Sequence, residues 1–267
     1  MTNCFKTLNP NRRKTMTNQD PHLHTTLREH LAELRLAQIA EVYQEVLNEA
    51  ARKNCSPLDV LATLVAAEVT ARRERTLQRR IAAARLPKRK TLEEFDFSFV
   101  KRIPKQKVLR LFDCEFVAQH QSAVLIGPTG VGKTHLLTAL GYTACERGVS
   151  VRFTRVVDML NGLTAAQING TLAKALKIYT TPSLLLLDEL GYLPIDKRGA
   201  DLMFQVVAAR YERGSTVITT NRPFRDWGKT FDLDNTLATA LIDRLMHHGE
   251  AVVIEGKSYR LKDQLPD

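Results

Sequence analysis

Hydrophobic residues repeat at helical spacing in the first third of the chain. Six of them recur at helical spacing and predict one amphipathic helix from about Thr26 to Ala51: Leu27, Leu31, Leu34, Ile39, Val42 and Val46. Ser56-Pro57-Leu58-Asp59 then supplies an N-cap, a proline at the first helical position and an acid, so a second helix is expected to run from Pro57 into the residues beyond Val69. Residues 1–20 lack this periodicity and are expected to be a disordered leader, with Met16 as an alternative start.

After Gln121 the pattern changes to short apolar runs separated by helical segments. Five strands are predicted, at Ser122–Ile126, Val151–Phe153, Ser183–Leu187, Thr216–Thr220 and Ala251–Ile254. This alternation predicts an α/β fold in which a parallel sheet is flanked by helices.

The predicted elements suggest four regions. The leader at 1–20 is followed by a small all-helical domain at 21–86, a basic linker at 87–100 and an α/β domain at 101–267. Pro87 and the cluster Lys88-Arg89-Lys90 interrupt the helical pattern and mark the linker. A short helix is expected around Lys105–Gln119, before the first strand.

The basic residues are concentrated in one stretch. The formal net charge is +10, and residues 71–110 hold fourteen basic and four acidic residues, which equals that excess. Lys and Arg on a helix and linker favour salt-sensitive, sequence-independent contact with phosphates, and the scarcity of aromatic residues favours duplex over single-stranded DNA. A solvated basic helix, or one that docks on an acidic protein, is the alternative. The predicted DNA-binding residues are Arg72, Arg73, Arg75, Arg79, Arg80, Lys88, Arg89 and Lys90.

Cysteine spacing and apolar run length exclude two classes of protein. The four cysteines show no metal-ligand spacing, which argues against structural zinc. No apolar run approaches the roughly 20 residues that a membrane-spanning helix needs. A reduced, cytoplasmic protein without a membrane partner is therefore expected.

A phosphate-binding pattern lies between the first predicted strand and the following helix. Gly127-Pro128-Thr129-Gly130-Val131-Gly132-Lys133-Thr134 matches GxxxxGK[ST], whose backbone N–H groups wrap phosphates at a helix N-terminus. Lys133 can reach the β and γ phosphates, and the Thr134 hydroxyl can ligate Mg²⁺. With His135, these residues form the predicted site for ATP; the alternative is a chance glycine-rich turn.

Polar residues end two of the later strands. Asp188 and Glu189 follow Leu184–Leu187, at the sheet edge where ligands bind in open α/β folds. Asp188 suits the Mg²⁺ shell, and Glu189 could polarise a water for attack on the γ-phosphate. Asn221 follows the next strand and could orient that water, or be a turn residue before a proline. Arg244 could be a surface cation or a finger that reaches a neighbouring subunit, and spacing alone favours the surface cation.

The order of these motifs resembles one family. The segments that carry the resemblance are the glycine loop, Asp188–Pro194, Thr219–Phe224, Trp227, Asp243–His248 and Ser258–Arg260. Together they resemble the IstB family, the ATP-binding helper proteins of insertion-sequence transposition. These are AAA+ ATPases related to DnaC-type helicase loaders. The resemblance covers roughly Thr26 to Lys262.

The resemblance implies an oligomeric AAA+ ATPase with ATP and Mg²⁺ at sites between subunits. Lys133 and Thr134 would form Walker A, Asp188 and Glu189 Walker B, and Asn221 sensor 1. Arg244 would be the arginine finger acting in trans. Only 13 residues follow Ile254, so no C-terminal helical lid is expected, and Arg260 is the one weak candidate for sensor 2.

Three functions are compatible with these residues. The preferred one is an ATP-dependent DNA-binding helper that assembles as a homo-oligomer on duplex DNA, engages a cognate transposase and hydrolyses ATP to disassemble. The alternative is a DnaC-like replicative helicase loader, whose core motifs are the same. A small-molecule P-loop kinase is disfavoured, because a water-directed Glu189 and a trans Arg244 suit hydrolysis better than transfer.

Overall fold

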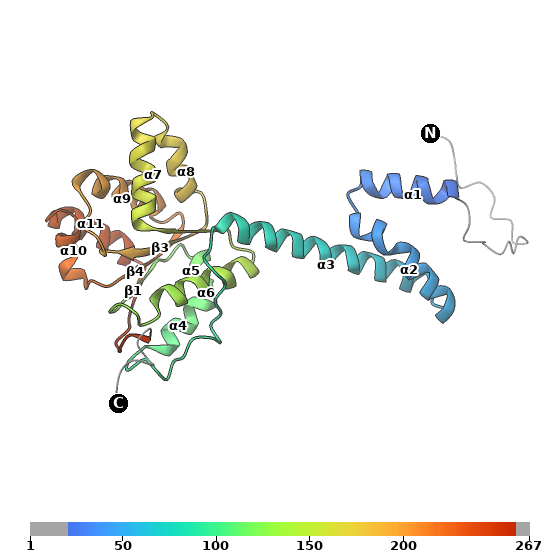
Figure 1. The fold of residues 1–267 in the computed structure, drawn as a ribbon, viewed down its shortest axis with the longest axis horizontal. Coiled ribbons are helices and arrows are strands. Elements are labelled where there is room, and N and C mark those ends of the chain that lie inside the picture. Colours follow the sequence, from blue (N-terminus) through green and yellow to red (C-terminus); the bar gives the residue numbers. More distant parts are fainter. Residues whose placement is uncertain (1–20, 260–267) are drawn as a thin grey trace, which may run out of the picture. The chain divides into compact units, whose positions relative to one another are not determined.

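Five parallel strands form the centre of the α/β part of the chain in the computed structural model, which describes residues 21–259 (Figure 1). The predicted leader at 1–20 and Arg260 lie outside the described residues. The strands are β1 Ala123–Ile126, β2 Val151–Arg155, β3 Leu184–Leu190, β4 Ser215–Thr220 and β5 Glu250–Val253. Their order in the sheet is β2-β3-β4-β1-β5. The predicted parallel sheet is confirmed, and β3 extends three residues past its expected end, so that Asp188 and Glu189 lie inside the strand.

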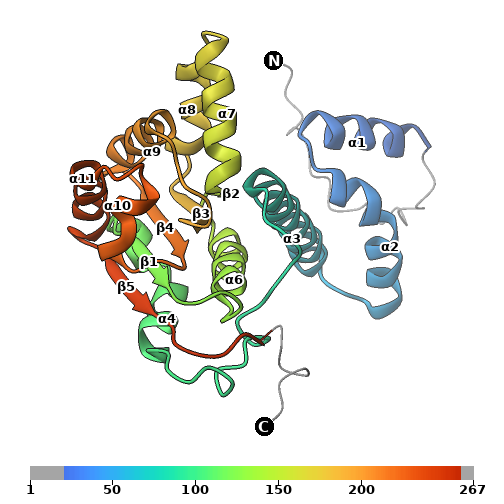
Figure 2. The same ribbon diagram turned by 60° about the vertical axis from the view of Figure 1, so that its left-hand side comes forward.

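Helices cover both faces of the sheet because successive strand residues point to opposite sides. Ala123 and Leu125 face a core that includes α4 Lys105–Phe112, α5 Glu115–Ala118 and α6 Lys133–Glu146. Val124 and Ile126 face the second core, on the other side (Figure 2). Six elements lie there: α7 Val156–Ile168, α8 Leu172–Thr180, α9 Lys197–Arg210, η1 Phe224–Asp226, α10 Trp227–Thr230 and α11 Asn235–Met246.

The first predicted helix is two helices, α1 Pro21–Glu33 and α2 Ala37–Lys53, so the single-helix prediction was wrong. The chain turns at Arg35, which has a left-handed φ of 57°. The turn exposes the first amides of α2, and the carboxylate of Glu68 accepts hydrogen bonds from the amides of Gln38 and Ile39 at 2.7 and 3.2 Å. A buried acid from elsewhere in the chain therefore decides where α2 begins.

The second predicted helix is α3 Pro57–Ala84, and its predicted start is confirmed. Ser56 Oγ accepts a hydrogen bond from the Asp59 amide at 3.2 Å, and the Asp59 carboxylate accepts one from the Ser56 amide at 3.1 Å. This is the reciprocal arrangement of a capping box.

The domain boundary differs from the one expected at residue 86. The chain separates into two compact units between Arg75 and Thr76, inside α3. The expected linker at 87–100 belongs to the second unit, where Phe95 is 8% exposed and is part of the core of the α/β domain. The helix expected at 105–119 is interrupted at Cys114, which has a φ of 57°. The expectation of no helical lid concerns mainly residues 260–267, which the structure does not describe.

None of the helices in the described residues 21–259 is long and apolar enough to cross a membrane.

Replacement of Glu68 by glutamine is expected to loosen the start of α2. The amides of Ile39 and Gln38 and the Arg75 guanidinium outweigh burial and lower the pKa of Glu68. The stability that Glu68 contributes is therefore fully present above its unfolded pKa of about 4.3. It is lost as the pH falls through the lower pKa that Glu68 has in the folded state. Hydrogen exchange should show weaker protection of the Gln38 and Ile39 amides in the variant, and a weaker dependence of that protection on pH below about 4.3. Glu41→Gln, on the exposed surface of α2, is the control and should leave both amides protected.

Candidate nucleotide-binding site

The glycine-rich loop lies between β1 and α6, where the sequence predicts it. Gly130 and Gly132 have φ angles of 86° and 93°, in the left-handed region that favours glycine. A Cβ at Gly132 would lie 2.5 Å from the Phe95 ring, so a side chain is also excluded by contact. The Lys133 ammonium donates hydrogen bonds to the carbonyls of Gly127 and Pro128, both at 2.7 Å. Lysine and glycines therefore form one compact loop at the N-terminus of α6.

Asp188 and Thr134 meet beside this loop. The Thr134 hydroxyl donates to Asp188 Oδ1 at 3.1 Å, and the Thr219 hydroxyl from β4 donates to the same oxygen at 2.5 Å. Asp188 is 3% exposed, so the two hydroxyl groups satisfy a carboxylate that is removed from water. A carboxylate and a threonine hydroxyl at this spacing are oxygen donors of the kind that Mg²⁺ prefers. The residues present thus fit a magnesium ion.

Asp188 is buried and Glu189 is exposed, and a bulge in β3 accompanies this difference. The pairing of β3 with β4 shifts in register between Leu187 and Leu190. Glu189, inside this bulge, is exposed and has a left-handed φ of 65°, and its amide donates to the Thr219 hydroxyl at 2.9 Å. Non-glycine residues adopt this conformation at a cost and often do so at functional sites. The bulge places Glu189 on the wall of the cavity above the loop.

A cavity of about 510 Å³ lies over the glycine loop. This volume is within the range of small-molecule sites. Glu189 and Asn221 line it on the sheet side. The segment expected to be a linker forms the opposite wall, and its contributions are Pro87, Lys88, Lys90, Glu94, Phe95, Asp96, Phe99 and Val100. His135 joins the two walls, since its Nε2 lies 2.8 Å from the Thr91 carbonyl oxygen.

A second cavity, of about 530 Å³, reaches the same acidic residues from the side of β2. It is lined by Thr134, Asp188 and Glu189, and by three arginines: Arg85, Arg152 and Arg155. Arg155 forms an ion pair with Asp158 at 2.8 Å, which raises the pKa of the arginine. The carboxylates of β3 can therefore be approached from two directions.

Several residues of the cavity were missed by the sequence reasoning. Thr219 anchors both Asp188 and the Glu189 amide, yet a threonine in a strand carries no signal of its own. Phe95 and Phe99 line the cavity, and their alternation with Phe97, which packs against the core, was a usable signal for a wall. Tyr259 lies against Phe99 with ring centroids 4.9 Å apart, and its amide donates to the Gly130 carbonyl at 3.0 Å. The chain after β5 therefore contacts the glycine loop.

The predicted DNA-binding residues have different surroundings in the structure, and several of them already contact other groups of the chain. Arg75 and Arg72 lie 2.9 and 3.8 Å from the buried carboxylate of Glu68, and Arg89 lies 3.4 Å from Glu146. Lys88 and Lys90 line the cavity over the glycine loop.

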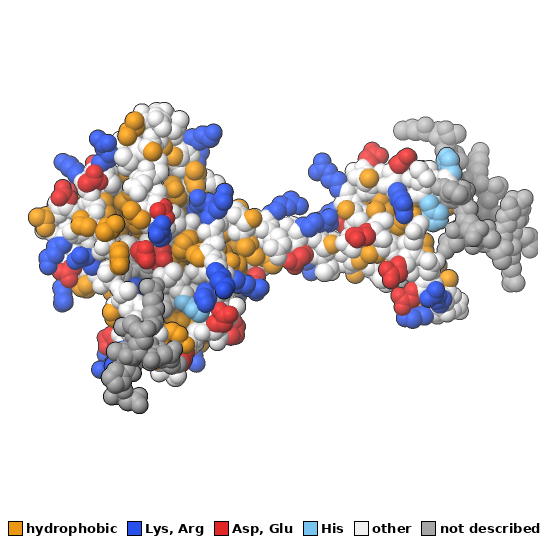
Figure 3. All heavy atoms as spheres, viewed as in Figure 1, with side chains coloured by type: hydrophobic (Ala, Val, Ile, Leu, Met, Phe, Trp, Pro, Cys, Tyr) orange, Lys and Arg blue, Asp and Glu red, His pale blue; other side chains and the backbone are white. Residues whose placement is uncertain are grey.

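Arg80 is half-buried beside Gly148. Arg73 and Arg79 are exposed, and no ion pair involves either of them within residues 21–259. Figure 3 shows Lys and Arg side chains on the exposed surface of α3. Contact between these residues and DNA stays a prediction.

Arg244 lies near the opposite edge of the sheet from the glycine loop. Its guanidinium lies 4.6 Å from the centroid of the Phe204 ring and donates to the Ala240 carbonyl at 2.9 Å. It shares a small hollow with Ser122 and Thr216, at the amino ends of β1 and β4, whereas the loop follows the carboxyl end of β1. The structure therefore does not bring Arg244 to the phosphate loop of its own chain.

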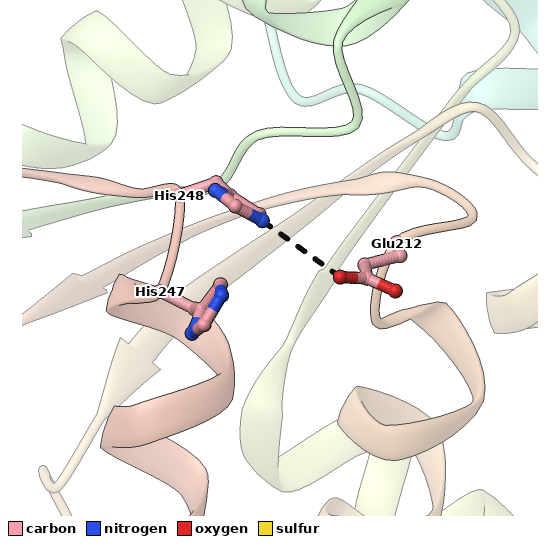
Figure 4. A group of neighbouring side chains, drawn as sticks. All are labelled: Glu212, His247 and His248. Atoms are coloured by element: carbon pink, nitrogen blue, oxygen red, sulfur yellow. Dashed lines mark ion pairs between the residues drawn. The ribbon is translucent and has the colours of Figure 1, made fainter.

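Glu212, His247 and His248 lie close together (Figure 4), and Glu212 and His248 line the same hollow as Arg244. His248 Nε2 is 3.7 Å from Glu212 Oε1, and the rings of His247 and His248 are 4.3 Å apart. All three side chains are exposed, with ligand-type atoms within 4.8 Å of one another. An exposed pair at this distance contributes little to stability.

Known proteins share both the sequence and the fold. The profile of the IstB-like ATP-binding protein family matches residues 29–266. A protein named as the ATP-binding protein of insertion sequence IS232 in Bacillus thuringiensis is 39% identical over 88% of this chain and 93% of its own length. Its counterpart from IS21 in Pseudomonas aeruginosa is 38% identical over 88% of each chain.

Solved structures share the α/β domain. AMPPCP-bound DnaA from Aquifex aeolicus superposes with a TM-score of 0.55 at 24% identity, over 67% of this chain and 54% of its own. DnaI superposes with a TM-score of 0.54 at 22% identity, over 62% of this chain and 91% of its own. At these identities the likeness concerns the fold alone, and it agrees with the AAA+ fold that the resemblance implies.

Proposed function

The chain belongs to the IstB-like ATP-binding protein family, and from this premise we propose that it is a magnesium-dependent ATPase that acts on DNA in insertion-sequence transposition. One observation carries the proposal: the Thr134 and Asp188 oxygens lie 3.1 Å apart beside the glycine loop, with Glu189 on the wall of the same cavity. The phosphates of a bound ATP would then have the Mg²⁺ ligands Thr134 and Asp188 on one side and the proton acceptor Glu189 on the other.

The cavity offers separate surfaces to the two ends of ATP. The phosphates lie against the loop amides at the N-terminus of α6, and Lys133 exchanges its bonds with the Gly127 and Pro128 carbonyls for bonds to phosphate oxygens. The apolar wall of Phe95, Phe99 and Val100 receives the base. Lys88 and Lys90, in the same wall, offer ammonium groups to the polyphosphate, and Glu94 and Asp96 in that wall offset their charge.

Hydrolysis then depends on two side chains at the carboxyl ends of the strands. Glu189 accepts a proton from the attacking water, and Asn221 orients that water through its amide. Thr134 and Asp188 would hold Mg²⁺, which would supply positive charge to the phosphates. Because Thr219 bonds to the Asp188 carboxylate and the Glu189 amide, it fixes the positions of both acidic residues relative to each other.

Arg244 serves the site of a neighbouring copy. Its place near the amino ends of the strands supports this role, because the phosphate loop of the same chain lies beyond the carboxyl ends. The partly buried guanidinium is held by Phe204 and the Ala240 carbonyl, so its position is preorganised. Hydrolysis would then require assembly of at least two subunits, and loss of the γ-phosphate would weaken the contact between them.

Mixing two inactive variants tests the shared site. Arg244→Ala and Lys133→Ala are each expected to lose ATP hydrolysis, for different reasons, and a mixture should regain part of the rate because some interfaces combine the intact loop of one chain with the intact arginine of the other. Steady-state phosphate release measures this. Arg213→Ala, an exposed arginine in the turn before β4, should leave the rate unchanged. A mixture that stays inactive, while the control is active, would remove Arg244 from the trans role.

The exposed arginines of α3 support contact with duplex DNA. The double variant Arg73→Ala/Arg79→Ala is expected to weaken binding and to reduce the slope of log K against log salt by about 2, close to 0.9 per lost phosphate contact. Fluorescence anisotropy on duplexes of unrelated sequence measures both quantities, and Arg213→Ala serves again as control. An unchanged slope would show that these arginines do not contact phosphates. Tighter binding to single strands, with stimulation of hydrolysis only by them, would favour a helicase loader.

The transposase is the expected partner of the assembled protein. Membership of a family named for insertion sequences supports this, since the named relatives match over nearly their whole length. Assembly on DNA in the ATP state, followed by recruitment of the transposase and hydrolysis, forms the proposed cycle.

A further inference from the structure

Three side chains with metal-ligand chemistry gather where β4 and β5 begin, whereas the glycine loop follows the carboxyl end of β1 (Figure 4). Glu212 lies in the turn between α9 and β4, and His247 and His248 lie between α11 and β5. One ligand-type atom of each residue lies within 4.8 Å of those of the other two. Two turns that are distant in the sequence therefore bring one carboxylate and two imidazoles together. We call these three residues the His-Glu cluster.

The imidazole nitrogens of the cluster are open to a ligand. His248 Nε2 lies 3.7 Å from Glu212 Oε1, which is beyond the ordinary length of a hydrogen bond. The His247 ring contacts the rings of Tyr211 and His248 edge-on. Within residues 21–259, no hydrogen bond engages a ring nitrogen of either histidine. All three side chains of the cluster are exposed, so an ion can reach them from solvent.

We propose that the His-Glu cluster binds one divalent transition-metal ion of the zinc class, with water completing the coordination. Two imidazole nitrogens and one carboxylate oxygen are a ligand set typical of zinc sites that keep an open position. Tetrahedral zinc with bonds of about 2.0–2.2 Å holds its ligand atoms about 3.3 Å apart. A small rotation of the exposed His248 and Glu212 side chains brings them to this spacing. Imidazole favours transition metals, whereas Mg²⁺ and Ca²⁺ prefer oxygen ligands.

Negative groups offset the positive charge near the cluster. Arg210 and Arg244 line the hollow beside it and repel a cation. Burial raises the pKa of Tyr211, and the charges of Glu212 and Asp243 raise it further, so a second carboxylate lies close to the first. The 12-residue helix α11 also ends here, and the negative end of its dipole favours a cation. Two carboxylates and a helix end thus balance the two guanidinium groups.

The bound ion joins the turn before β4 to the turn before β5. No residue of the cluster lines either of the two cavities beside the glycine loop. Zinc binding therefore requires no nucleotide, and its failure would leave the proposed ATPase unaffected. Because the two turns are brought together only in the folded chain, the ion stabilises that state by mass action.

Zinc titration of the full chain, without an affinity tag and freed of metal, is the test. The wild type is expected to bind one Zn²⁺ in isothermal titration calorimetry without ATP, to keep it in excess Mg²⁺, and to gain in Tm. His247→Gln/His248→Gln should bind at least about 100-fold more weakly, since outer-shell partners alone are worth about 10- to 100-fold. His30→Gln, at an exposed histidine of α1, is the control and should bind like the wild type. Circular dichroism checks that each variant is folded.

Cobalt substitution then identifies the ligands. Co²⁺ bound to the wild type should show the d–d absorption of nitrogen and oxygen ligation without a thiolate charge-transfer band. Glu212→Cys should add that band, because sulfur then enters the ligand set. A thiolate band already present in the wild type would assign the ion to a cysteine, such as the exposed Cys55, and overturn the proposal. A wild type that binds no zinc, a double variant with wild-type affinity, or a Glu212→Cys spectrum without the band would overturn it too.

Discussion

Replacement of Glu189 by glutamine is expected to lower the rate of ATP hydrolysis by about 10²- to 10⁴-fold, the usual contribution of a positioned general base. The substitution keeps the shape of the side chain and removes its ability to accept a proton. Binding of ATP should persist, because the glycine loop, Lys133 and the Thr134–Asp188 pair are unchanged. The variant should therefore accumulate the ATP-bound assembly on DNA.

Two measurements check this expectation: phosphate release, and binding of a fluorescent ATP analogue. Glu115→Gln is a matched control, because Glu115 is an exposed acid at the start of α5 and lines neither of the two cavities beside the glycine loop. It should hydrolyse ATP like the wild type. If Glu189→Gln also retains the wild-type rate, Glu189 is not the base, and the bulge in β3 would need another explanation.

Replacement of Arg210 by methionine is expected to destabilise the α/β domain by about 3–5 kcal/mol, because several buried oxygens would lose their only charged donor. Arg210 is 1% exposed, and its guanidinium donates to the carbonyls of Tyr179, Pro182, Ser183 and Ser215 and to the Thr216 hydroxyl. Burial lowers the pKa of Arg210 to about 10, so the group stays charged at neutral pH. It joins the end of α8 to the starts of β3 and β4.

Thermal unfolding followed by circular dichroism measures the loss, which corresponds to a fall in Tm of about 10 °C for a unit of this size. Arg213→Met, at an exposed position three residues away, should change Tm little. An Arg210→Met protein as stable as the wild type would mean that water replaces the guanidinium at all of these oxygens.

Local patterns in the sequence were sufficient for much of the fold and for the chemistry of the loop. The glycine spacing before Lys133, the apolar runs of the five strands and the capping box at Ser56 each depend on neighbours within a few residues. Such features are readable because their energetics are local: backbone conformation, alternation across a strand, and orphan amides at a helix start.

Other features depended on partners that are distant in the sequence. Glu68 begins α2 from 30 residues away, Thr219 fixes Asp188 from a neighbouring strand, and Arg210 collects carbonyl groups from several segments. The segment at 87–100 looks like a basic linker in composition, yet Phe95 packs on the glycine loop and Lys88 lines the cavity.

The sequence by itself determined that a phosphate loop, two strand-end acids and a parallel sheet occur together, because each is encoded in contiguous residues. Only the tertiary structure decided that β3 is bulged at Glu189, that an aromatic wall closes the cavity, and that Arg244 lies away from the loop of its own chain. These depend on strand register and on contacts between separate segments, and the free energy that fixes them appears only when the sheet is assembled.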